Sequence, residues 1–245
     1  MKITEAKSFH CVPAIKENYL KEMEVLFADN KPHAIMLDFE DSISDNAKDN
    51  ARVLLASQYT EIRDTCAKHD VLMGLRINSF DTQWYKDDIG FALKFPDVLK
   101  ALDPKTDVFI IAHEDPCSEY GIERPLDLSV LNPLSFFILT LLSKARKYGL
   151  IIIDGASREF REEYMENFIR ECRLEKSWGL DGKISIHPRQ IKHINAIFDM
   201  QEDRERAKET VKKFESLTDG SAVVTDEKGN MMDLPSLRMY KKLLK

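Results

Sequence analysis

The feature that most constrains this chain is a regular alternation between short apolar runs rich in β-branched residues and longer amphipathic or charged segments. Short apolar runs bounded by polar clusters are typical of buried strands, and segments of the second kind are typical of helices. The strand pattern occurs at Ser8–Val12, Ala34–Leu37, Val71–Ile77, Val108–Ala112, Leu150–Ile153 and Lys183–Ile186. Helices are predicted at Ile15–Ala28, Ala47–Ala67, Leu134–Tyr148, Arg158–Leu174 and Arg189–Phe198. Strands that alternate with helices in this way pair in parallel, because the helix supplies the crossover that parallel pairing needs.

The succession of these units predicts an α/β fold, a TIM-type (β/α) barrel with a reduced or modified strand count, since a full barrel has eight strands. A charged helix at Gln201–Leu217, a hairpin pattern at Ser221–Leu234 and a short helix at Leu237–Lys245 follow the last strand. We therefore expect a barrel over residues 1–198 and a small C-terminal helix-hairpin arm over residues 199–245. The arm is too small for a core of its own, so we expect it to pack on the barrel or on a neighbouring subunit.

The charge balance and cysteine usage exclude several classes of protein. With 36 Lys plus Arg against 42 Asp plus Glu, the net charge is −6, which argues against a nucleic-acid binder. The four cysteines are widely spaced and predict neither a disulfide framework nor a zinc site. The longest apolar stretch, Leu134–Leu142, is about half of the ~20 residues that a membrane-spanning helix needs. No secretory signal pattern is present at the N-terminus, so we expect a cytoplasmic protein without a membrane partner.

Polar side chains follow the predicted strands, and in a parallel barrel these positions meet at the carboxyl end of the sheet. They are Asp38, Glu40, Asp41, Arg76, Asn78, His113, Glu114, Asp115, Asp154 and His187. Such a carboxylate-rich set with one arginine suits Mg²⁺, which prefers oxygen ligands, and an anionic substrate held by the guanidinium fork. Any single carboxylate could instead cap the helix that follows it. We expect His187 to be structural, fixing the last strand-to-helix turn.

Five segments, taken in order, resemble a known family. They are AIMLDFEDSI (Ala34–Ile43), LRIN (Leu75–Asn78), IIIDG (Ile151–Gly155), GLDGKISIHPRQI (Gly179–Ile191) and GNMMDLP (Gly229–Pro235). Together they are similar to the citrate lyase beta subunit-like branch of the HpcH/HpaI aldolase family, and the resemblance extends over nearly the whole chain.

The resemblance implies a Mg²⁺-assisted carbon–carbon lyase acting on a 3-hydroxyacyl-CoA such as citryl-, malyl- or citramalyl-CoA. It also implies a homo-oligomer, a trimer or a multiple of it. Two alternatives stay open: an aldolase on a free 2-keto acid without CoA, or a catalytically degenerate relative that binds a small acid or a partner.

Site roles follow from the resemblance position by position. Arg76 matches the arginine that binds the substrate acid, with Asn78 and Asp38 beside it as substrate-binding residues. Asp115 matches the metal-binding aspartate of the family's E-D-L turn, and Glu114 could be a second metal ligand. Glu40 and Asp41 match the acidic pair that orders the water shell of the metal. Asp233 resembles the catalytic lid aspartate that reaches a neighbouring subunit's site.

The middle of the chain departs from the family pattern. The family has an E-T pair whose glutamate is the other metal ligand, and no such pair lies between Pro104 and the segment Asp107–Asp115. An alternative alignment places Asp107–Asp115 on the preceding strand of the family and leaves the E-D-L strand without a counterpart. Under either alignment one metal carboxylate is missing, which is the main support for the degenerate alternative.

Overall fold

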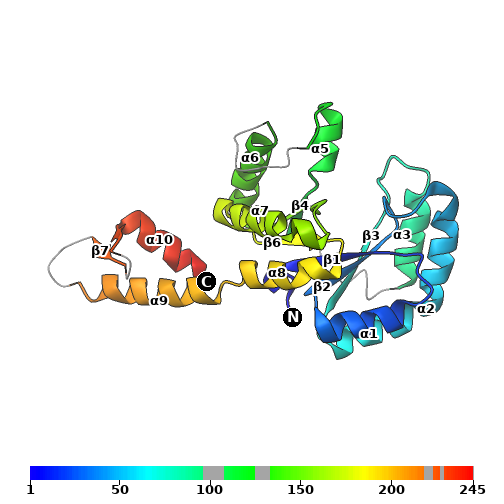
Figure 1. Ribbon diagram of the computed structural model, residues 1–245, viewed down its shortest axis with the longest axis horizontal. Helices are drawn as coiled ribbons and strands as arrows, with labels where there is room; N and C mark the ends of the chain where they lie inside the picture. Colours follow the sequence, from blue (N-terminus) through cyan, green and yellow to red (C-terminus); the bar gives the residue numbers. More distant parts are fainter. Residues whose placement is uncertain (96–107, 125–132, 218–222, 227–228, 245) are drawn as a thin grey trace. The chain divides into compact units, whose positions relative to one another are not determined.

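The computed structural model describes residues 1–95, 108–124, 133–217, 223–226 and 229–244 (Figure 1). The chain divides into two compact units, Met1–Phe198 and Asp199–Lys245. The first unit contains one parallel sheet built from β1 (Ser8–Pro13), β2 (Ala34–Asp38), β3 (Leu72–Arg76), β4 (Val108–Ile111), β5 (Ile151–Asp154) and β6 (Gly182–Ser185). The strand order is β3-β2-β1-β6-β5-β4, so the first and last strands are neighbours at the centre of the sheet.

Helices lie against this sheet (Figure 1). They are α1 (Tyr19–Asp29), α2 (Lys48–Lys68), α3 (Tyr85–Lys94), α5 (Glu114–Glu119), α6 (Pro133–Lys147), α7 (Met165–Trp178) and α8 (Pro188–Phe198). Short 3₁₀ turns occur at Ile3–Glu5, Asp45–Ala47 and Glu162–Tyr164.

The sheet is a half-barrel, and the prediction of a reduced barrel is confirmed. All six expected strands are present, and β3 and β4 form the two edges within the described residues. Pro104 lies outside the described residues.

The alternation of side chains along the strands gives the sheet two apolar faces. On β2, Ile35 and Leu37 point to the helices and join a large core with α1 and α2, whereas Ala34 and Met36 point to the opposite face. That inner face collects apolar side chains from every strand: Phe9, Ala34, Met36, Leu72, Val108, Ile151, Ile153 and Ile184. These side chains form one continuous apolar cluster along the inner face of the sheet.

Two helices were not predicted from the sequence, and two start later than expected, α1 at Tyr19 rather than Ile15 and α7 at Met165. α3 and α5 are short, and α5 spans only six residues, too few for a clear helical period. α7 begins at Met165 rather than at Arg158, and the intervening residues form a loop in which Arg158 pairs with Glu114.

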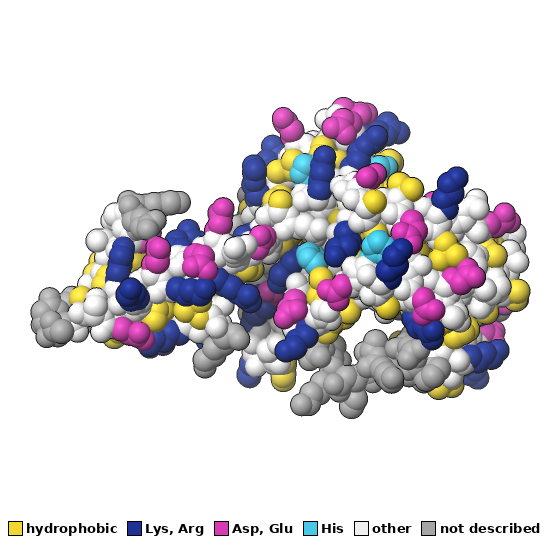
Figure 2. Space-filling view, turned by 90° about the horizontal axis from the view of Figure 1, so that it is seen from below, with side chains coloured by type: hydrophobic (Ala, Val, Ile, Leu, Met, Phe, Trp, Pro, Cys, Tyr) yellow, Lys and Arg dark blue, Asp and Glu magenta, His cyan; other side chains and the backbone are white. Residues whose placement is uncertain are grey.

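The second unit contains α9 (Gln201–Glu215), a hairpin of β7 (Val224–Thr225) with β8 (Met231–Met232), and α10 (Leu234–Leu243). The expectation that this unit has no core of its own is wrong, because it has a small core of Ala207, Phe214, Met232 and Tyr240. No helix among the described residues is long and apolar enough to span a membrane. On the face shown in Figure 2, acidic and basic side chains are interspersed, as the charge balance implies.

Candidate active site

The carboxyl ends of β2 and β3 place Asp38 beside Arg76, since the two residues are direct partners in the strand register. Arg76 Nε donates to Asp38 Oδ1 at 2.7 Å, and Arg76 Nη2 donates to Asp38 Oδ2 at 2.6 Å. Asp38 is fully buried, whereas the Arg76 side chain is 33% exposed. Burial by itself would raise the pKa of Asp38, but the two-pronged contact with the Arg76 guanidinium holds the pKa below its usual value.

Two further carboxylates lie beside the exposed end of Arg76. Arg76 Nη1 donates to Asp41 Oδ2 at 3.0 Å and lies 3.4 Å from Glu40 Oε2. Burial raises the pKa of Glu40, and the charges of Asp41, Asp38 and Asp115 raise it further, against the opposing charge of Arg76. Asp115 follows β4, the edge strand at the opposite end of the sheet from β3, which carries Arg76. We call Arg76, Glu40, Asp41 and Asp115 the acidic mouth.

Buried groups support the turn that carries Glu40 and Asp41. Lys48 Nζ donates to the Phe39 and Glu40 carbonyl oxygens at 3.0 and 2.9 Å. Asn78 Nδ2 donates to the Phe39 carbonyl oxygen at 3.0 Å and to Asp88 Oδ2 at 2.7 Å. The expectation that Asn78 binds substrate therefore needs correction, because its amide is buried under the turn and both of its donors are engaged.

The expected substrate-binding role of Asp38 changes for a similar reason. Both of its carboxylate oxygens accept from Arg76, and the side chain has no exposed surface. Asp38 thus orients Arg76 instead of contacting a ligand. A guanidinium has five N–H donors, and three of these contact Asp38 and Asp41, which leaves one on each terminal nitrogen for a bound acid.

Glu114 and Asp115, the two expected metal ligands, lie in different environments at the start of α5. Arg158 Nε donates to Glu114 Oε1 at 2.9 Å, Arg158 Nη2 contacts Glu114 Oε2, and Arg124 Nη1 donates to Oε1 at 3.3 Å. Burial opposes ionisation of Glu114, but the two arginines outweigh it and lower its pKa. Asp115 is exposed. Glu114 is therefore held as an ion pair, whereas Asp115 is exposed beside it.

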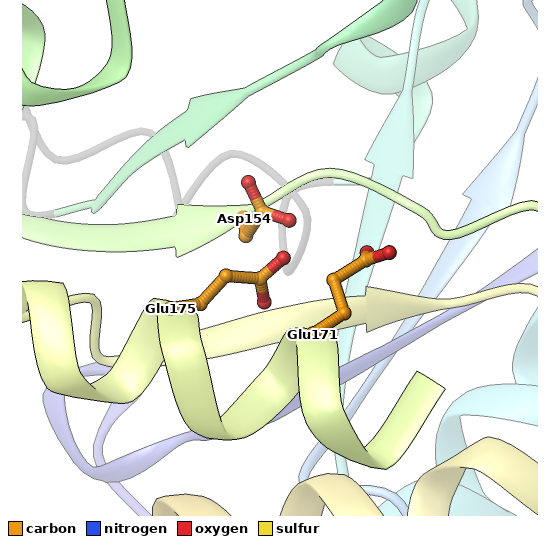
Figure 3. Close-up of side chains that lie close together, drawn as sticks. All are labelled: Asp154, Glu171 and Glu175. Atoms are coloured by element: carbon orange, nitrogen blue, oxygen red, sulfur yellow. The ribbon is translucent and has the colours of Figure 1, made fainter. Parts of the chain in front are cut away.

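A second acidic group lies between β5 and α7, where Asp154, Glu171 and Glu175 point toward one another (Figure 3). Their oxygens lie within 4.8 Å of one another, a spacing that could suit a metal ion. The buried ammonium of Lys183 takes that place: its Nζ lies 2.8 Å from Glu171 and 2.7 Å from Glu175 and contacts Asp154. Burial would lower the pKa of Lys183, yet the three carboxylates raise it well above its usual value. The group therefore does not fit a metal, because the ammonium of Lys183 already occupies the space between the carboxylates.

Glu175 gives a testable pH dependence of stability. Burial, followed by the charge of Asp154, raises the pKa of Glu175 well above its usual value, so the folded state favours the neutral carboxyl. A raised folded-state pKa makes folding progressively less favourable as the pH rises above that of the unfolded glutamate, ~4.3. The Glu175→Gln variant lacks this titration, so its stability relative to the parent should rise by up to ~1.4 kcal/mol per pH unit above that point.

Urea unfolding at pH 5 and pH 8 measures this difference. The matched control is Glu166→Gln on the exposed side of α7, which should show no such pH trend. A Glu175→Gln difference that is the same at both pH values would contradict a neutral Glu175.

A cavity of about 750 Å³ lies along β1 and α1 and reaches the β6–α8 turn. Its lining includes Lys16, Tyr19, Ile186 and His187, and also Cys11, whose Sγ donates to Asp38 Oδ2 at 3.6 Å. The cavity therefore begins next to the residues that orient Arg76.

Sequence reasoning did not identify three buried basic residues, Lys48, Arg124 and Lys183, as parts of this region. A signal existed for Lys183, because a lysine inside an otherwise apolar strand has to be paired with carboxylates when it is buried. No comparable signal marks Arg124, which lies in a polar segment after α5.

Comparisons with known proteins agree with this architecture. Residues 101–238 match the family described as C-C bond lyase of the TIM-barrel fold, and residues 13–109 match HpcH/HpaI aldolase/citrate lyase. A (3S)-malyl-CoA thioesterase of Cereibacter sphaeroides is 27% identical over 76% of this chain and 75% of its own. A citrate lyase subunit beta of Leuconostoc mesenteroides is 25% identical over 96% of this chain and 90% of its own.

Among solved structures, the CitE protein of Mycobacterium tuberculosis in complex with magnesium, acetoacetate and coenzyme A is similar in fold. The TM-score is 0.70 at 17% sequence identity, and the match covers 99% of this chain and 98% of that one. The first of the two family matches alone spans more than half of the sequence. The chain belongs to the HpcH/HpaI aldolase and citrate lyase family of TIM-barrel carbon–carbon bond lyases.

Proposed function

We propose that the protein is a Mg²⁺-assisted lyase that cleaves a carbon–carbon bond in a 3-hydroxyacyl-CoA such as citryl-, malyl- or citramalyl-CoA. The observation that carries the proposal is the acidic mouth, in which Arg76 contacts Glu40 and Asp41 at the carboxyl end of the half-barrel and the exposed Asp115 follows β4. Relatives support it, since they include a malyl-CoA thioesterase and citrate lyase beta subunits, and a protein of similar fold binds magnesium, acetoacetate and coenzyme A.

Charge explains why a cation belongs in this mouth. Asp38 balances Arg76, and Glu40, Asp41 and Asp115 then leave an excess of negative charge that would repel an acid substrate. Asp115 is the residue placed to hold Mg²⁺, with Glu40 as a second ligand directly or through water, a coordination typical of this ion. Glu114 is not part of this set because two arginines hold it. When bound there, Mg²⁺ would stabilise the negative charge that develops on the substrate oxygens during cleavage.

The side chains of the chain itself supply binding and proton transfer. The remaining N–H groups of Arg76 point to the exposed end of its guanidinium and would bind the substrate carboxylate. Cleavage removes the proton of the 3-hydroxyl group, leaves a carbonyl on one fragment, and returns a proton to the enolate of the other. Glu40, which lies 3.4 Å from Arg76, is the residue suited to carry that proton. Asp41 would order the water around the cation.

Asp233 enters the proposal through the family resemblance. It lies in the second unit, where it caps α10: Asp233 Oδ1 accepts from the Ser236 backbone N–H at 3.0 Å and from its hydroxyl at 2.9 Å. We propose a homo-oligomer, a trimer or a multiple of it, in which Asp233 of one copy reaches the mouth of another. The CoA portion of the substrate would occupy the cavity beside β1 and α1.

The test incubates purified protein with malyl-, citramalyl- and citryl-CoA in millimolar Mg²⁺, with an EDTA control. Lyase activity on malyl-CoA forms acetyl-CoA and glyoxylate, whereas simple hydrolysis forms malate and free CoA, so the products identify the reaction. Formation of the carbon–carbon cleavage products, abolished by EDTA, would support the proposal. No turnover of any of the three, together with no calorimetric Mg²⁺ binding, would favour the degenerate alternative, and turnover of a free keto acid alone would favour the aldolase.

Arg76→Lys is expected to weaken binding of oxaloacetate or pyruvate, in the presence of Mg²⁺, by at least about tenfold. Lysine keeps the positive charge but not the planar fork that serves Asp38 on one side and a bound acid on the other. Isothermal titration calorimetry measures the change, and Arg63→Lys on the exposed side of α2 is the matched control. Unchanged keto-acid affinity in the Arg76→Lys variant would remove Arg76 from the binding site.

A further inference from the structure

The junction between β4 and α5 carries three consecutive polar residues that point in different directions. His113 is buried, and its Nε2 lies 2.5 Å from Asp154 Oδ1. Glu114 pairs with Arg124 and Arg158. Asp115 is exposed. Two of the three residues are therefore anchored, and the third is exposed.

Arg124 is the most connected of these anchors. Its side chain is only 5% exposed, and Nη1 donates to the Ala156 carbonyl oxygen at 2.7 Å as well as to Glu114. Its Nη2 donates to Glu171 Oε1 at 3.1 Å. One guanidinium thus links the first turn of α5 to the loop after β5 and to α7.

The same anchor continues into the buried charged group of Figure 3. Glu171, which accepts from Arg124, also lies 2.8 Å from Lys183 Nζ, and Lys183 contacts Asp154. Asp154 in turn lies against His113. A continuous chain of contacts therefore leads from Glu114 through Arg124 to the buried charged group, and from that group to His113. Glu114 and His113 are adjacent in the turn between β4 and α5.

Helix α5 depends on such anchors because it has six residues and ends before it could be stable by itself. We propose that Arg124 is a positioning residue for the Mg²⁺ site: through Glu114 it holds the turn that carries Asp115. This inference rests on the proposed function. Lysine could not replace Arg124, because a single ammonium cannot reach three acceptors in different directions as the planar fork does.

Electrostatics make the inference testable. Replacing Arg124 or Arg158 with glutamine removes a positive charge near a cation site. Because like charges repel, this change by itself would strengthen Mg²⁺ binding. Loss of positioning would have the opposite effect, since removal of groups that orient a metal ligand lowers affinity by about 10- to 100-fold. The sign of the change therefore separates the two effects.

The experiment measures Mg²⁺ affinity by isothermal titration calorimetry for the parent and for Arg124→Gln, Arg158→Gln, Glu114→Gln and the Arg124→Gln/Glu114→Gln pair. We expect each single variant to bind Mg²⁺ about tenfold or more weakly. The pair should be no weaker than the weaker single variant, because both changes break one linkage. Arg170→Gln, on the exposed side of α7, is the matched control and should bind as the parent does.

Each other outcome has a distinct meaning. If the parent binds no Mg²⁺, the proposed function fails and this inference fails with it. If the parent binds and the variants bind equally well or more tightly, the proposed function stands and the positioning role is overturned; tighter binding by Arg124→Gln would mean that the released Glu114 is itself a ligand. Additive losses in the pair would also overturn it. Should Arg124→Gln not fold, Arg158→Gln and Glu114→Gln, whose side chains are 55% and 47% exposed in the parent, decide the question alone.

Discussion

Asp115→Asn is expected to lower the affinity for Mg²⁺ on the order of a hundredfold or more and to abolish Mg²⁺-dependent cleavage of the acyl-CoA substrates. Asparagine keeps the size of the side chain but removes the negative charge, and a hard cation is held mainly by charged oxygen ligands. Asp115 is the only member of the acidic mouth that comes from the β4 side among the described residues, so the neighbouring carboxylates cannot replace its direction of approach. Calorimetric titration measures the Mg²⁺ affinity, and the acyl-CoA cleavage assay measures the activity.

The matched control for this prediction is Glu119→Gln, which removes one negative charge from the exposed C-terminal end of the same helix. It should leave Mg²⁺ affinity within about twofold of the parent, because an exposed charge outside the coordination shell is largely screened. If Asp115→Asn and Glu119→Gln have equal effects, Asp115 is not a ligand, and only the general negative charge of this region attracts the cation.

Lys183→Met is expected to lower the free energy of unfolding by about 3–5 kcal/mol, because it leaves buried carboxylates without their cation. Lys183 has no exposed surface, and its ammonium contacts Asp154, Glu171 and Glu175. Removing one partner of a buried ionic group exposes the full desolvation penalty of the charges that remain. Urea unfolding at pH 7 gives the free energy, and methionine fills a similar volume, so the loss cannot be assigned to a cavity.

Lys192→Met on α8 serves as the comparison, since Lys192 is exposed. A substitution of this kind should change stability by less than about 0.5 kcal/mol. A loss in Lys183→Met below about 1 kcal/mol would mean that the carboxylates around it protonate readily.

Much of the fold was predictable because strand and helix signals are local. The runs of Ile and Val at β2, β4 and β5 alternate with amphipathic segments, and every expected strand is present in one parallel sheet. The order of the polar residues along the chain also placed Arg76 and Asp115 at the carboxyl end of the sheet, since that location follows from the direction of the strands. Helix α5 was missed because six residues contain too little periodicity to show a helical face.

The separation of neighbouring residues into different roles could not be read from the sequence. Glu114 and Asp115 are adjacent and chemically alike, yet one is clamped by two arginines and the other is exposed at the mouth. Asn78 follows a strand like the site residues but is buried beneath a turn. These differences depend on contacts between segments that are far apart in the chain.

By itself, the sequence determined which segments become strands, that the strands are parallel, and which residue types gather at their carboxyl ends, because backbone preference and apolar periodicity act over a few residues. The tertiary structure decided which of those carboxylates is balanced by a buried cation and which keeps its charge for a ligand. That decision depends on burial and on ion pairs such as Arg124 with Glu171 and Lys183 with Asp154, whose partners are 47 and 29 residues apart. The energy of a charge is set by all the groups around it in three dimensions, which local patterns do not contain.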